Sequence, residues 1–234
     1  MKCLILASGF ATRLYPLTLT RAKPLLVYRG RPLLSHLVDQ VPEGIEIAVT
    51  VNRKFERDFK VWQEKAPRDV ELVVEEVWNE QQSLGAIGSL SNAITRLSIN
   101  EDILVLAGDN YFEFSLPEFI SGSNGVNACL AVYDIGNIEA AKELGVLAVE
   151  GSKVTEFEEK PAQPKSTLVA TGCYILPARI IPVLEDYCAD HRRDNLGDFI
   201  RHLVEEDEVH AWSFKEEWVD IGSEFSPWDV ESQR

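Results

Sequence analysis

The sequence predicts an α/β fold in which a parallel β-sheet is covered by helices. Short apolar runs rich in β-branched residues alternate along the chain with stretches whose apolar residues recur at helical spacing. This alternation is typical of strand–helix–strand units around a parallel sheet. The length supports the same conclusion, because 234 residues with 45% hydrophobic content suffice for one large core. We therefore expect one domain over residues 1–234.

The first half of the chain shows the regular alternation. The expected strands are Cys3–Ala7, Ile45–Val51, Val70–Val74 and Ile103–Ala107. The helices expected between them have apolar faces formed by Leu33, Leu34, Leu37 and Val38, then by Phe55, Phe59 and Trp62, then by Ile87, Leu90, Ile94 and Leu97. Ligands of open parallel sheets bind beyond the carboxyl ends of the strands, so the polar residues after these strands are candidate site residues.

The second half of the chain is mixed α and β. Longer strands are expected at Val126–Tyr133, Gly145–Val149, Val154–Phe157 and Leu168–Leu176, and helices near Ile180–Tyr187 and Asp198–Val204. No linker separates this part from the first, so we treat residues 1–110 and 111–223 as two halves of one domain.

The composition limits the partners and the compartment. A formal charge of -15 repels nucleic acid and anionic membrane surfaces, so neither is expected as a partner. The four cysteines have no spacing that suggests a metal site or disulfides, and they are expected to be free thiols. The opening apolar run ends at Ala7, and no stretch approaches the roughly 20 apolar residues of a membrane span. We expect a soluble, cytoplasmic protein.

The first candidate site is the loop that follows the first strand. Small residues at Ala7, Ser8, Gly9 and Ala11 allow backbone N–H groups to approach phosphate, and Arg13 and Lys23 supply positive charge. The loop is neither a Walker A loop nor a dinucleotide-binding turn, which counts against a nicotinamide oxidoreductase. A surface loop with incidental basic residues is the alternative interpretation.

The second candidate site is Asp109, which directly follows the expected strand Ile103–Ala107 and Gly108. An aspartate in this position can simply form a turn. As a hard oxygen ligand at the end of a strand, it can equally hold Mg²⁺ against substrate phosphates.

The loop resembles the signature of the sugar-1-phosphate nucleotidyltransferases. The matching runs are Leu6-Ala7-Ser8-Gly9-Phe10-Ala11-Thr12-Arg13-Leu14, Pro16-Leu17-Thr18 and Lys23-Pro24. The resemblance implies a Rossmann-like, mostly parallel mixed sheet with helices on both faces, and a loop, Thr12 included, that wraps the nucleoside triphosphate. It implies catalytic roles for Arg13 and Lys23 on the phosphates that leave as pyrophosphate. Ala11 replaces a family glycine, and costs roughly 1 kcal/mol if this position needs positive φ.

The same resemblance implies a metal site and a third catalytic residue. Asp109 matches the family's aspartate that binds the nucleotide and Mg²⁺, and Trp218-Val219-Asp220-Ile221-Gly222-Ser223 matches its Trp-x-Asp-x-Gly pattern, which makes Asp220 the second metal ligand. Glu159-Lys160-Pro161 matches the family's Glu-Lys-Pro, in which the glutamate holds sugar hydroxyls and the lysine holds the phosphate of the sugar 1-phosphate. Standing alone, this segment would be a charged turn before proline.

Other matches imply further binding residues. Those for the sugar pocket are Gly145, Thr171, Gly172 and Asp198, although each alone is explained as a turn, a strand or a helix cap. Base recognition is expected at Gln81 or Gln82 and at Gly85. The resemblance covers Met1 to about Ser223, which leaves no room for a C-terminal extension and argues against a second, acetyltransferase activity.

The function expected from the resemblance is Mg²⁺-dependent transfer of a nucleotidyl group to a sugar 1-phosphate, with pyrophosphate as the second product. Runs such as Asp109–Leu116 and Pro164–Val169 are similar to short glucose-1-phosphate thymidylyltransferase-like members, which favours glucose 1-phosphate with dTTP or UTP. One alternative is cytidylyl transfer to phosphocholine, with Trp212, Trp218 and Tyr174 available for an aromatic cage. Another is a non-catalytic regulatory subunit that binds nucleotide sugars. A homo-oligomer is left open.

Overall fold

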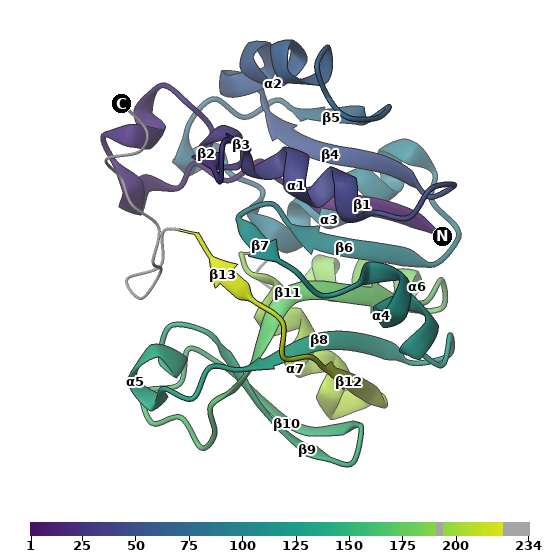
Figure 1. The fold of residues 1–234 in the computed structure, drawn as a ribbon. Coiled ribbons are helices and arrows are strands. Elements are labelled where there is room, and N and C mark those ends of the chain that lie inside the picture. Colours follow the sequence, from purple (N-terminus) through teal and green to yellow (C-terminus); the bar gives the residue numbers. More distant parts are fainter. Residues whose placement is uncertain (191–193, 222–234) are drawn as a thin grey trace.

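The computed structural model describes residues 1–190 and 194–221, which form a nine-stranded sheet with helices on both faces (Figure 1). The strand order is β5-β4-β1-β6-β11-β8-β12-β10-β9. Four of these strands come from the first 110 residues and pair in parallel: β1 (Lys2–Leu6), β4 (Glu46–Asn52), β5 (Glu71–Glu75) and β6 (Ile103–Ala107). The predicted parallel sheet of the first half is therefore confirmed.

The second half extends the same sheet with both strand directions. Its strands are β8 (Ala128–Asp134), β9 (Gly145–Glu150), β10 (Lys153–Glu159), β11 (Leu168–Leu176) and β12 (Val209–Ser213). Strand β11 joins the halves because it pairs antiparallel with both β6 and β8. The sequence did not reveal β12, whose alternation is weak because its middle residues are only half-buried.

The helices cover the two faces of the sheet because its apolar residues alternate along each strand. Cys3 and Ile5 of β1 point to the face covered by α1 (Leu33–Gln40), α2 (Glu56–Gln63) and α4 (Leu116–Gly122). Leu4 points to the face covered by α3 (Gly85–Leu97), α6 (Ile180–Asp190) and α7 (Leu196–Glu206). Helix α5 (Ile138–Ala141) lies between β8 and β9 in the chain. The predicted helices of both halves are confirmed.

Two short ribbons shape the carboxyl edge of the parallel strands. The hairpin of β2 (Val27–Tyr28) and β3 (Arg31–Pro32) follows the loop after β1. Strand β13 (Trp218–Asp220) pairs with β7 (Asn110–Phe112), so the end of the described chain lies against the segment that follows β6 (Figure 1). Single 3-10 turns occur at Thr12–Leu14, Leu17–Leu19, Lys23–Leu25, Arg53–Phe55 and Glu80–Gln82.

Two further expectations concern the cysteines and membrane-spanning helices. The four cysteines lie within the described residues, all are buried, and no disulfide joins them. Among the helices of residues 1–190 and 194–221, none is long and apolar enough to span a membrane.

Candidate active site

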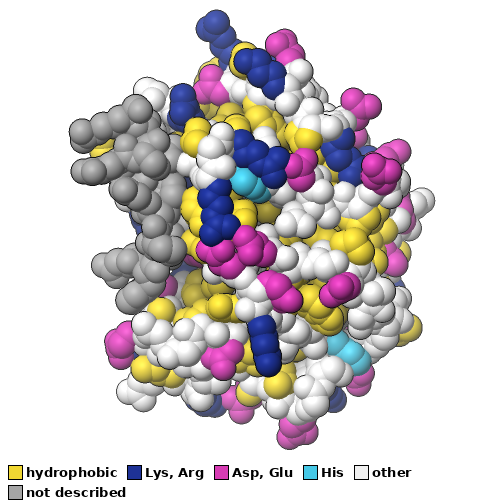
Figure 2. Space-filling model, in the orientation of Figure 1, with side chains coloured by type: hydrophobic (Ala, Val, Ile, Leu, Met, Phe, Trp, Pro, Cys, Tyr) yellow, Lys and Arg dark blue, Asp and Glu magenta, His cyan; other side chains and the backbone are white. Residues whose placement is uncertain are grey.

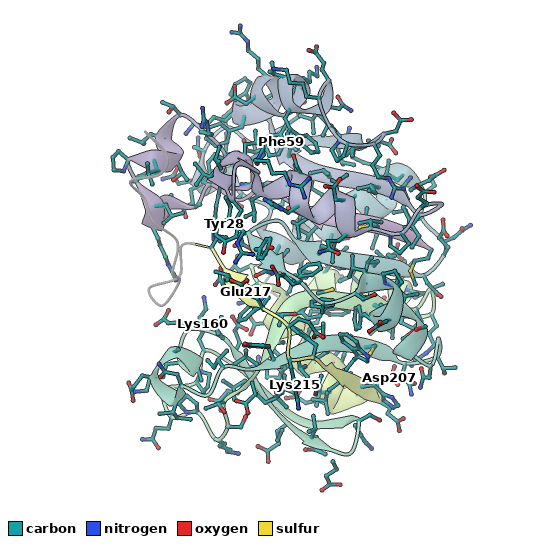
Figure 3. All side chains as sticks on the ribbon, viewed as in Figure 1. Tyr28, Phe59, Lys160, Asp207, Lys215 and Glu217 are labelled. Atoms are coloured by element: carbon teal, nitrogen blue, oxygen red, sulfur yellow. The ribbon has the colours of Figure 1, made fainter. Side chains whose placement is uncertain are left out.

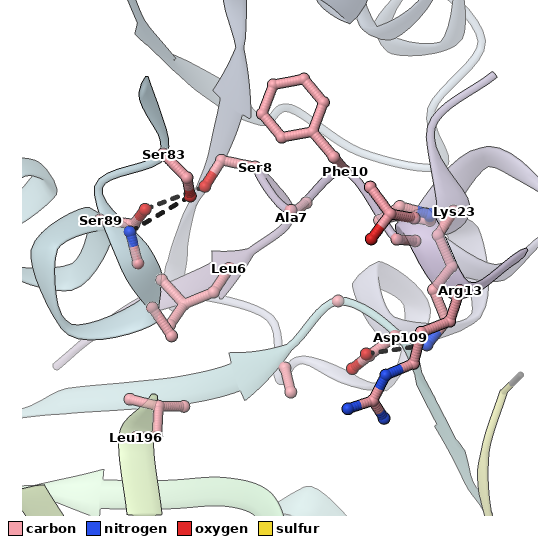
Figure 4. A pocket seen from close by; sticks show the side chains of 18 of the residues that line it. Leu6, Ala7, Ser8, Phe10, Arg13, Lys23, Ser83, Ser89, Asp109 and Leu196 are labelled. Carbon is pink, nitrogen blue, oxygen red and sulfur yellow. Dashed lines mark hydrogen bonds and ion pairs between the residues drawn. The ribbon is translucent and has the colours of Figure 1, made fainter. Parts of the chain in front are cut away.

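A cavity of about 910 Å³ opens at the carboxyl ends of β1 and β6 (Figure 4). It lies where parallel-sheet proteins place their ligands. Eleven of the predicted site residues line it: Ala7, Ser8, Gly9, Ala11, Thr12, Arg13, Lys23, Gly85, Asp109, Lys160 and Asp220. The structure thus brings together the loop after β1, both candidate metal ligands and Lys160.

The loop after β1 is held in shape by its own side chains. Ala11 has φ 47°, so the position does require the left-handed conformation that a glycine would adopt more readily. Buried Thr18 donates a hydrogen bond of 2.8 Å to the Ala11 carbonyl and fixes this turn. The amide of Ala7 is already used, since it donates to the Thr50 carbonyl and hydroxyl oxygens. Ala7 therefore contributes shape to the cavity, and its N–H is not available for phosphate.

Three charged residues, here called the inner cluster, meet at one side of the cavity: Lys23, Asp109 and Asp220. Lys23 Nζ lies 2.9 Å from Asp109 Oδ2 and 3.7 Å from Asp220 Oδ1, and Figure 4 shows Lys23 and Asp109 facing each other. The lysine side chain is 13% exposed, against 44% and 27% for the aspartates. Burial opposes the charged form of Lys23, but the carboxylates outweigh it and raise the pKa of the ammonium.

The two aspartates of the inner cluster repel each other. Burial, together with the negative charge of Asp109, raises the pKa of Asp220 to about 6, although Lys23 opposes this shift. The positive charges of Lys23 and Lys160 lower this pKa without cancelling the shift. The cluster would be stabilised by another cation with a preference for hard oxygen ligands, which is a property of Mg²⁺.

Pairing of β7 with β13 creates the inner cluster. Asp220 is paired with Asn110, the residue after Asp109, and the Ile221 amide donates a 3.0 Å hydrogen bond to the Asp109 carbonyl. Residues 110 positions apart thereby become neighbours. Gly222 and Ser223, the last residues of the predicted Trp-x-Asp-x-Gly motif, lie outside the described residues.

The opposite side of the cavity is formed by the second half of the chain. Lys160 is exposed there, in a left-handed conformation (φ 49°), with its amide bonded to the Leu144 carbonyl at 3.0 Å. Arg13 reaches across from the loop after β1 and lies 3.8 Å from the Glu143 carboxylate. Two lysines and an arginine thus converge on one cavity of a strongly acidic chain, which supplies the local positive charge that phosphate binding needs.

The predicted sugar residues form a layer next to this cavity and do not line it. The Glu159 carboxylate fits between Gly145 and Gly197, because a Cβ on those glycines would lie 3.1 Å and 2.0 Å from Glu159 Oε2. Burial raises the pKa of Glu159, with Lys160 lowering it and Asp198 raising it further. Asp198 itself is held by Asn195, which donates to its carboxylate at 2.9 Å and caps helix α7.

Thr171 and Gly172 bring β11 close to the cavity wall. They lie where the pairing of β11 with β8 shifts register. Thr171 is buried and donates to the Ala131 carbonyl at 2.9 Å. Gly172 has φ 73°, and a Cβ there would lie 2.8 Å from the Ala107 Cβ and 3.0 Å from Asn110 Nδ2. Their contacts are with the protein interior.

The predicted base-reading segment is only partly at the cavity. Gly85 lines it at the start of α3, whereas Gln82 does not. The Gln82 side chain accepts a 2.9 Å hydrogen bond from the Trp78 amide, so its carbonyl oxygen is used within its own turn. Gln81 is exposed and does not line the cavity.

The cavity also contains residues that the sequence did not single out. Gly108 permits close contact between strands, because a Cβ there would lie 2.6 Å from the Leu6 carbonyl oxygen. Ser89 lies one helical turn after Gly85, a spacing that could have identified it, and it is 2.9 Å from the Ser8 hydroxyl (Figure 4). Glu80, Glu143 and Asp194 also line the cavity, and no local pattern points to them.

A buried carboxylate lies behind Ser8 and Ser89. Glu75 ends β5, is 3% exposed, and receives hydrogen bonds from Ser89 and Ser8. Burial raises its pKa, and those hydrogen bonds oppose the shift. Its Oε1 atom has no hydrogen-bond partner among the described residues.

The donor set fits one divalent cation shared with a ligand. Among residues 1–190 and 194–221, no three His, Cys, Asp or Glu side chains are grouped so that they could hold a metal ion alone. Asp109 and Asp220 supply two carboxylates, and Mg²⁺ commonly binds through one or two carboxylates plus substrate phosphates. The residues present therefore fit Mg²⁺ bound together with a phosphate ligand.

Fold and site together define an α/β protein whose cavity, at the carboxyl ends of parallel strands, is suited to phosphate groups and a divalent cation. The sequence model of the family described as nucleotidyl transferase matches residues 2–234. The chain therefore belongs to the nucleotidyl transferase family, which is a family of enzymes.

Known relatives agree with this assignment. The bifunctional protein GlmU of Methanococcus maripaludis is 29% identical over 235 residues, covering 98% of this chain and 53% of the relative. A Sulfolobus acidocaldarius protein, provisionally named a mannose-1-phosphate guanyltransferase, is 27% identical over 228 residues, covering 95% of this chain and 60% of the relative. The chain thus spans about half the length of the curated relatives it matches.

A solved structure shares the fold. It is from Bacillus anthracis, carries the provisional name glucose-1-phosphate thymidylyltransferase, and was determined in complex with sucrose. The TM-score is 0.82 at 22% sequence identity, and the match covers 97% of this chain and 92% of the other. The predicted fold class, with its mixed sheet and helices on both faces, is confirmed by this likeness.

Proposed function

We propose that the chain transfers a nucleotidyl group from a nucleoside triphosphate to a sugar 1-phosphate, with Mg²⁺ as cofactor. The observation that carries the proposal is the inner cluster: one partly buried ammonium between two carboxylates, inside the cavity of a nucleotidyl transferase family member. In this proposal residues 1–110 bind the nucleotide and residues 111–223 bind the sugar phosphate, as two halves of one domain.

The reaction is an in-line displacement at the α-phosphorus. An oxygen of the sugar phosphate forms the new bond, the bond to the oxygen that bridges the α- and β-phosphorus breaks, and pyrophosphate leaves with the electron pair. A phosphate monoester with a second pKa near about 6 is mostly ionised at neutral pH, so no general base is needed. The protein contributes positioning and charge stabilisation.

The inner cluster and Arg13 form the nucleotide side. Asp109 and Asp220 would hold Mg²⁺, which when bound withdraws charge from the α-phosphate as a Lewis acid. Lys23 is fixed by two ion pairs and keeps its charge because its pKa is raised, so it can stabilise the departing pyrophosphate. Arg13 is exposed, and its one ion pair among the described residues, with Glu143, is long, so phosphate can compete for it.

Lys160 and Glu159 form the acceptor side. Lys160 faces the cavity opposite the inner cluster and would align the sugar phosphate for attack. Glu159, Asp198 and Gly145 lie one layer further out, where a carboxylate packed between glycines has a fixed direction suited to sugar hydroxyls. Thr171 and Gly172 would support this pocket through the backbone of β11.

We propose glucose 1-phosphate with dTTP or UTP as the substrate pair. The similarity of Asp109–Leu116 and Pro164–Val169 to short thymidylyltransferase-like sequences supports it. The provisional name of the Bacillus anthracis structure points the same way. Because GlmU and a guanyltransferase are among the relatives, the experiment below also includes other nucleotides and sugar phosphates.

Phosphocholine is less well supported as the acceptor. A choline pocket needs aromatic rings around the cation. Tyr174 is 4% exposed, and Trp212 packs against Phe114 and Phe119 beneath α4. Neither these two residues nor Trp218 lines the cavity.

Pyrophosphate release tests the proposal. Purified protein with Mg²⁺ is assayed with dTTP, UTP, CTP, GTP and ATP against the 1-phosphates of glucose, mannose, galactose and N-acetylglucosamine, and against phosphocholine. We expect release that depends on one sugar phosphate and is lost in Asp109→Asn. Release only with phosphocholine would replace the acceptor in the proposal. Nucleotide binding without release in any pair would support a regulatory subunit.

A further inference from the structure

A second group of charges, the outer cluster, lies at the surface beside the inner one: Arg29, Glu113 and Glu217. Arg29 Nη1 donates to Glu113 Oε1 at 2.7 Å, and Nη2 donates to both carboxylate oxygens of Glu217 at 2.8 and 2.6 Å. Nη1 also donates to the Tyr111 hydroxyl at 2.8 Å, and this hydroxyl donates to Glu113. Figure 2 shows dark-blue and magenta side chains in contact over β2, β3 and β7.

The two clusters are built from the same three segments. Lys23 precedes the β2–β3 hairpin and Arg29 lies in its turn, and Asp109 and Glu113 flank β7. Glu217 directly precedes β13 and Asp220 ends it. Each segment thus places one residue in the inner cluster and one, three to six positions away, in the outer cluster, with the same charge sign.

The backbone between the clusters is short. Three residue pairs, Trp218 with Phe112, Val219 with Tyr111 and Asp220 with Asn110, join β13 to β7. One flanking hydrogen bond runs from the Glu113 amide to the Glu217 carbonyl at 2.9 Å, at the outer cluster, and another from the Ile221 amide to the Asp109 carbonyl, at the inner one. A displacement of β13 at its outer end would therefore also move Asp220.

Arg29 holds an unfavourable backbone conformation. Its φ is 48° and that of Gly30 is 85°, so both central residues of the hairpin turn are left-handed. Such turns favour Asn-Gly, and a side chain that is not Asn, Asp or Gly costs roughly 1–2 kcal/mol there. The contacts of the Arg29 side chain with Glu113 and Glu217 offset this backbone cost and explain why an arginine occupies the turn.

Aromatic packing keeps the guanidinium over β7. The Arg29 Cζ atom lies 4.7 Å from the centre of the Tyr111 ring, and the rings of Tyr28 and Tyr111 are 4.9 Å apart. Tyr111 also packs with Val219 and Ile221 of the β13 segment. Figure 3 shows Tyr28 of the hairpin next to Glu217. The hairpin therefore contacts β7 and the approach to β13 at once.

We propose that Arg29 is a positioning residue that clamps Glu113 and Glu217, and thereby sets the separation of Asp109 and Asp220 for the metal ion. The inference rests on the proposed function, because it assumes that these aspartates bind Mg²⁺. A planar guanidinium can bind one carboxylate with two bonds and a second with another, which an ammonium cannot do in the same geometry. Loss of the clamp loosens β13 at its outer end.

Binding of Mn²⁺, measured by electron paramagnetic resonance without substrates, tests the clamp directly. The variant is Arg29→Asn, because asparagine is favoured in this turn and the hairpin should fold well. We expect its dissociation constant to rise about tenfold, within the range for residues that orient metal ligands through other groups. Arg29→Lys should be intermediate. In Mg²⁺ titrations of turnover, the half-saturating concentration should rise while kcat at saturation stays near that of the wild type.

Arg31→Asn is the matched control. Arg31 lies in the same hairpin, but it contacts His36 and Asp39 of α1 and not β13. We expect wild-type Mn²⁺ affinity for it. Equal affinity of Arg29→Asn and wild type would overturn the clamp. A separate outcome, Asp220→Asn binding Mn²⁺ as tightly as wild type, would instead overturn the metal site of the proposed function.

A double-mutant cycle gives a second criterion. If Arg29 acts through Glu217, then Arg29→Asn in the Glu217→Gln background should change the Mn²⁺ dissociation constant less than twofold. A full tenfold effect in that background would contradict the clamp, because Arg29 would then act on the site by another route.

Discussion

The two edges of the parallel strands each carry a lysine between two carboxylates, and only one of these groups is part of a convincing site. At the carboxyl edge, Lys23 meets Asp109 and Asp220 in a cavity of about 910 Å³. At the amino edge, Lys2 lies 3.3 Å from Glu46 and 3.4 Å from Glu71 beside a hollow of about 930 Å³. Both lysine side chains are 13% exposed. The two edges are therefore nearly the same in lysine burial and in cavity volume, so neither property distinguishes the candidate site.

The difference lies in the carboxylates. Glu46 and Glu71 are 81% and 53% exposed and sit on long side chains that can separate in solvent. Asp109 and Asp220 are shorter, less exposed, and fixed by the β7–β13 pairing. Burial and the negative charge of Asp109 raise the pKa of Asp220, so a further cation would stabilise its charged form. Enforced proximity of charges, more than their number or the size of the hollow, distinguishes the candidate site.

The largest effect should come from the carboxylates. Asp109→Asn or Asp220→Asn removes a proposed metal ligand, and kcat/KM for pyrophosphate release should fall by about 10²–10³-fold or more. Glu46→Gln and Glu71→Gln make the same chemical change at the other edge and should leave kcat/KM unchanged. Thermal unfolding serves as the folding control. Comparable losses of kcat/KM in the aspartate variants and in the glutamate variants would show that the difference between the two edges does not determine activity.

The lysines should differ next most strongly. Lys23→Met removes a fixed charge from the leaving pyrophosphate and should lower kcat/KM about 10²-fold. It should also lower the melting temperature, because it leaves two close carboxylates uncompensated. Lys2→Met breaks exposed ion pairs, so the free energy of unfolding should fall by less than about 1 kcal/mol with unchanged turnover. Urea titrations and steady-state kinetics on both variants measure these differences.

Gly172 tests whether the backbone near the inner cluster must approach closely. Gly172→Ala adds both the strain of positive φ and a contact of 2.8 Å with the Ala107 Cβ. Gly151→Ala adds only the strain, since φ is 63° and nothing lies within 4 Å of its Cβ position. We expect Gly151→Ala to cost roughly 1 kcal/mol of stability without changing turnover, and Gly172→Ala to cost more and to reduce turnover about tenfold. Equal effects in urea titrations and kinetics would show that the contact relaxes freely.

The smallest expected effect concerns pH and the buried Glu75. Burial raises its folded-state pKa, so between the ordinary carboxyl pKa and the raised one the folded state holds a proton that the unfolded chain has released. Stability contributed by this group is therefore lost as pH rises through that window. In melting curves from pH 4.5 to 8, wild type should lose stability relative to Glu75→Gln as pH rises. The stability difference between wild type and Glu71→Gln, a change at an exposed position on the same strand, should not follow pH in this way.

Local patterns were sufficient for eight of the nine strands of the large sheet and for two of the three residues of the inner cluster. Asp109 follows a buried strand, and Lys23 lies in a loop too long and too basic for a simple turn. Asp220 could be paired with Asp109 only through the family resemblance, because a three-residue strand has no periodicity of its own. The Arg29 clamp was not foreseen, since its three residues meet only through tertiary contacts. For the same reason Glu143 and Asp194 were not connected with the cavity.

The predicted sugar and base residues show a second limit of sequence reasoning. A motif identifies which residues lie near a site but not the layer in which each lies. Thr171 and Gly172 shape the wall from behind, and Gln82 bonds within its own turn. Their direct contact with substrate remains a prediction.

The most direct test of the central claim is anomalous diffraction from crystals soaked with Mn²⁺ and nucleotide. One data set reports on both edges of the sheet. We expect a manganese peak bound by Asp109 and Asp220, and none beside Glu46 and Glu71. A peak at the Lys2 edge with none at the inner cluster would contradict the claim that enforced proximity of the two aspartates makes the site.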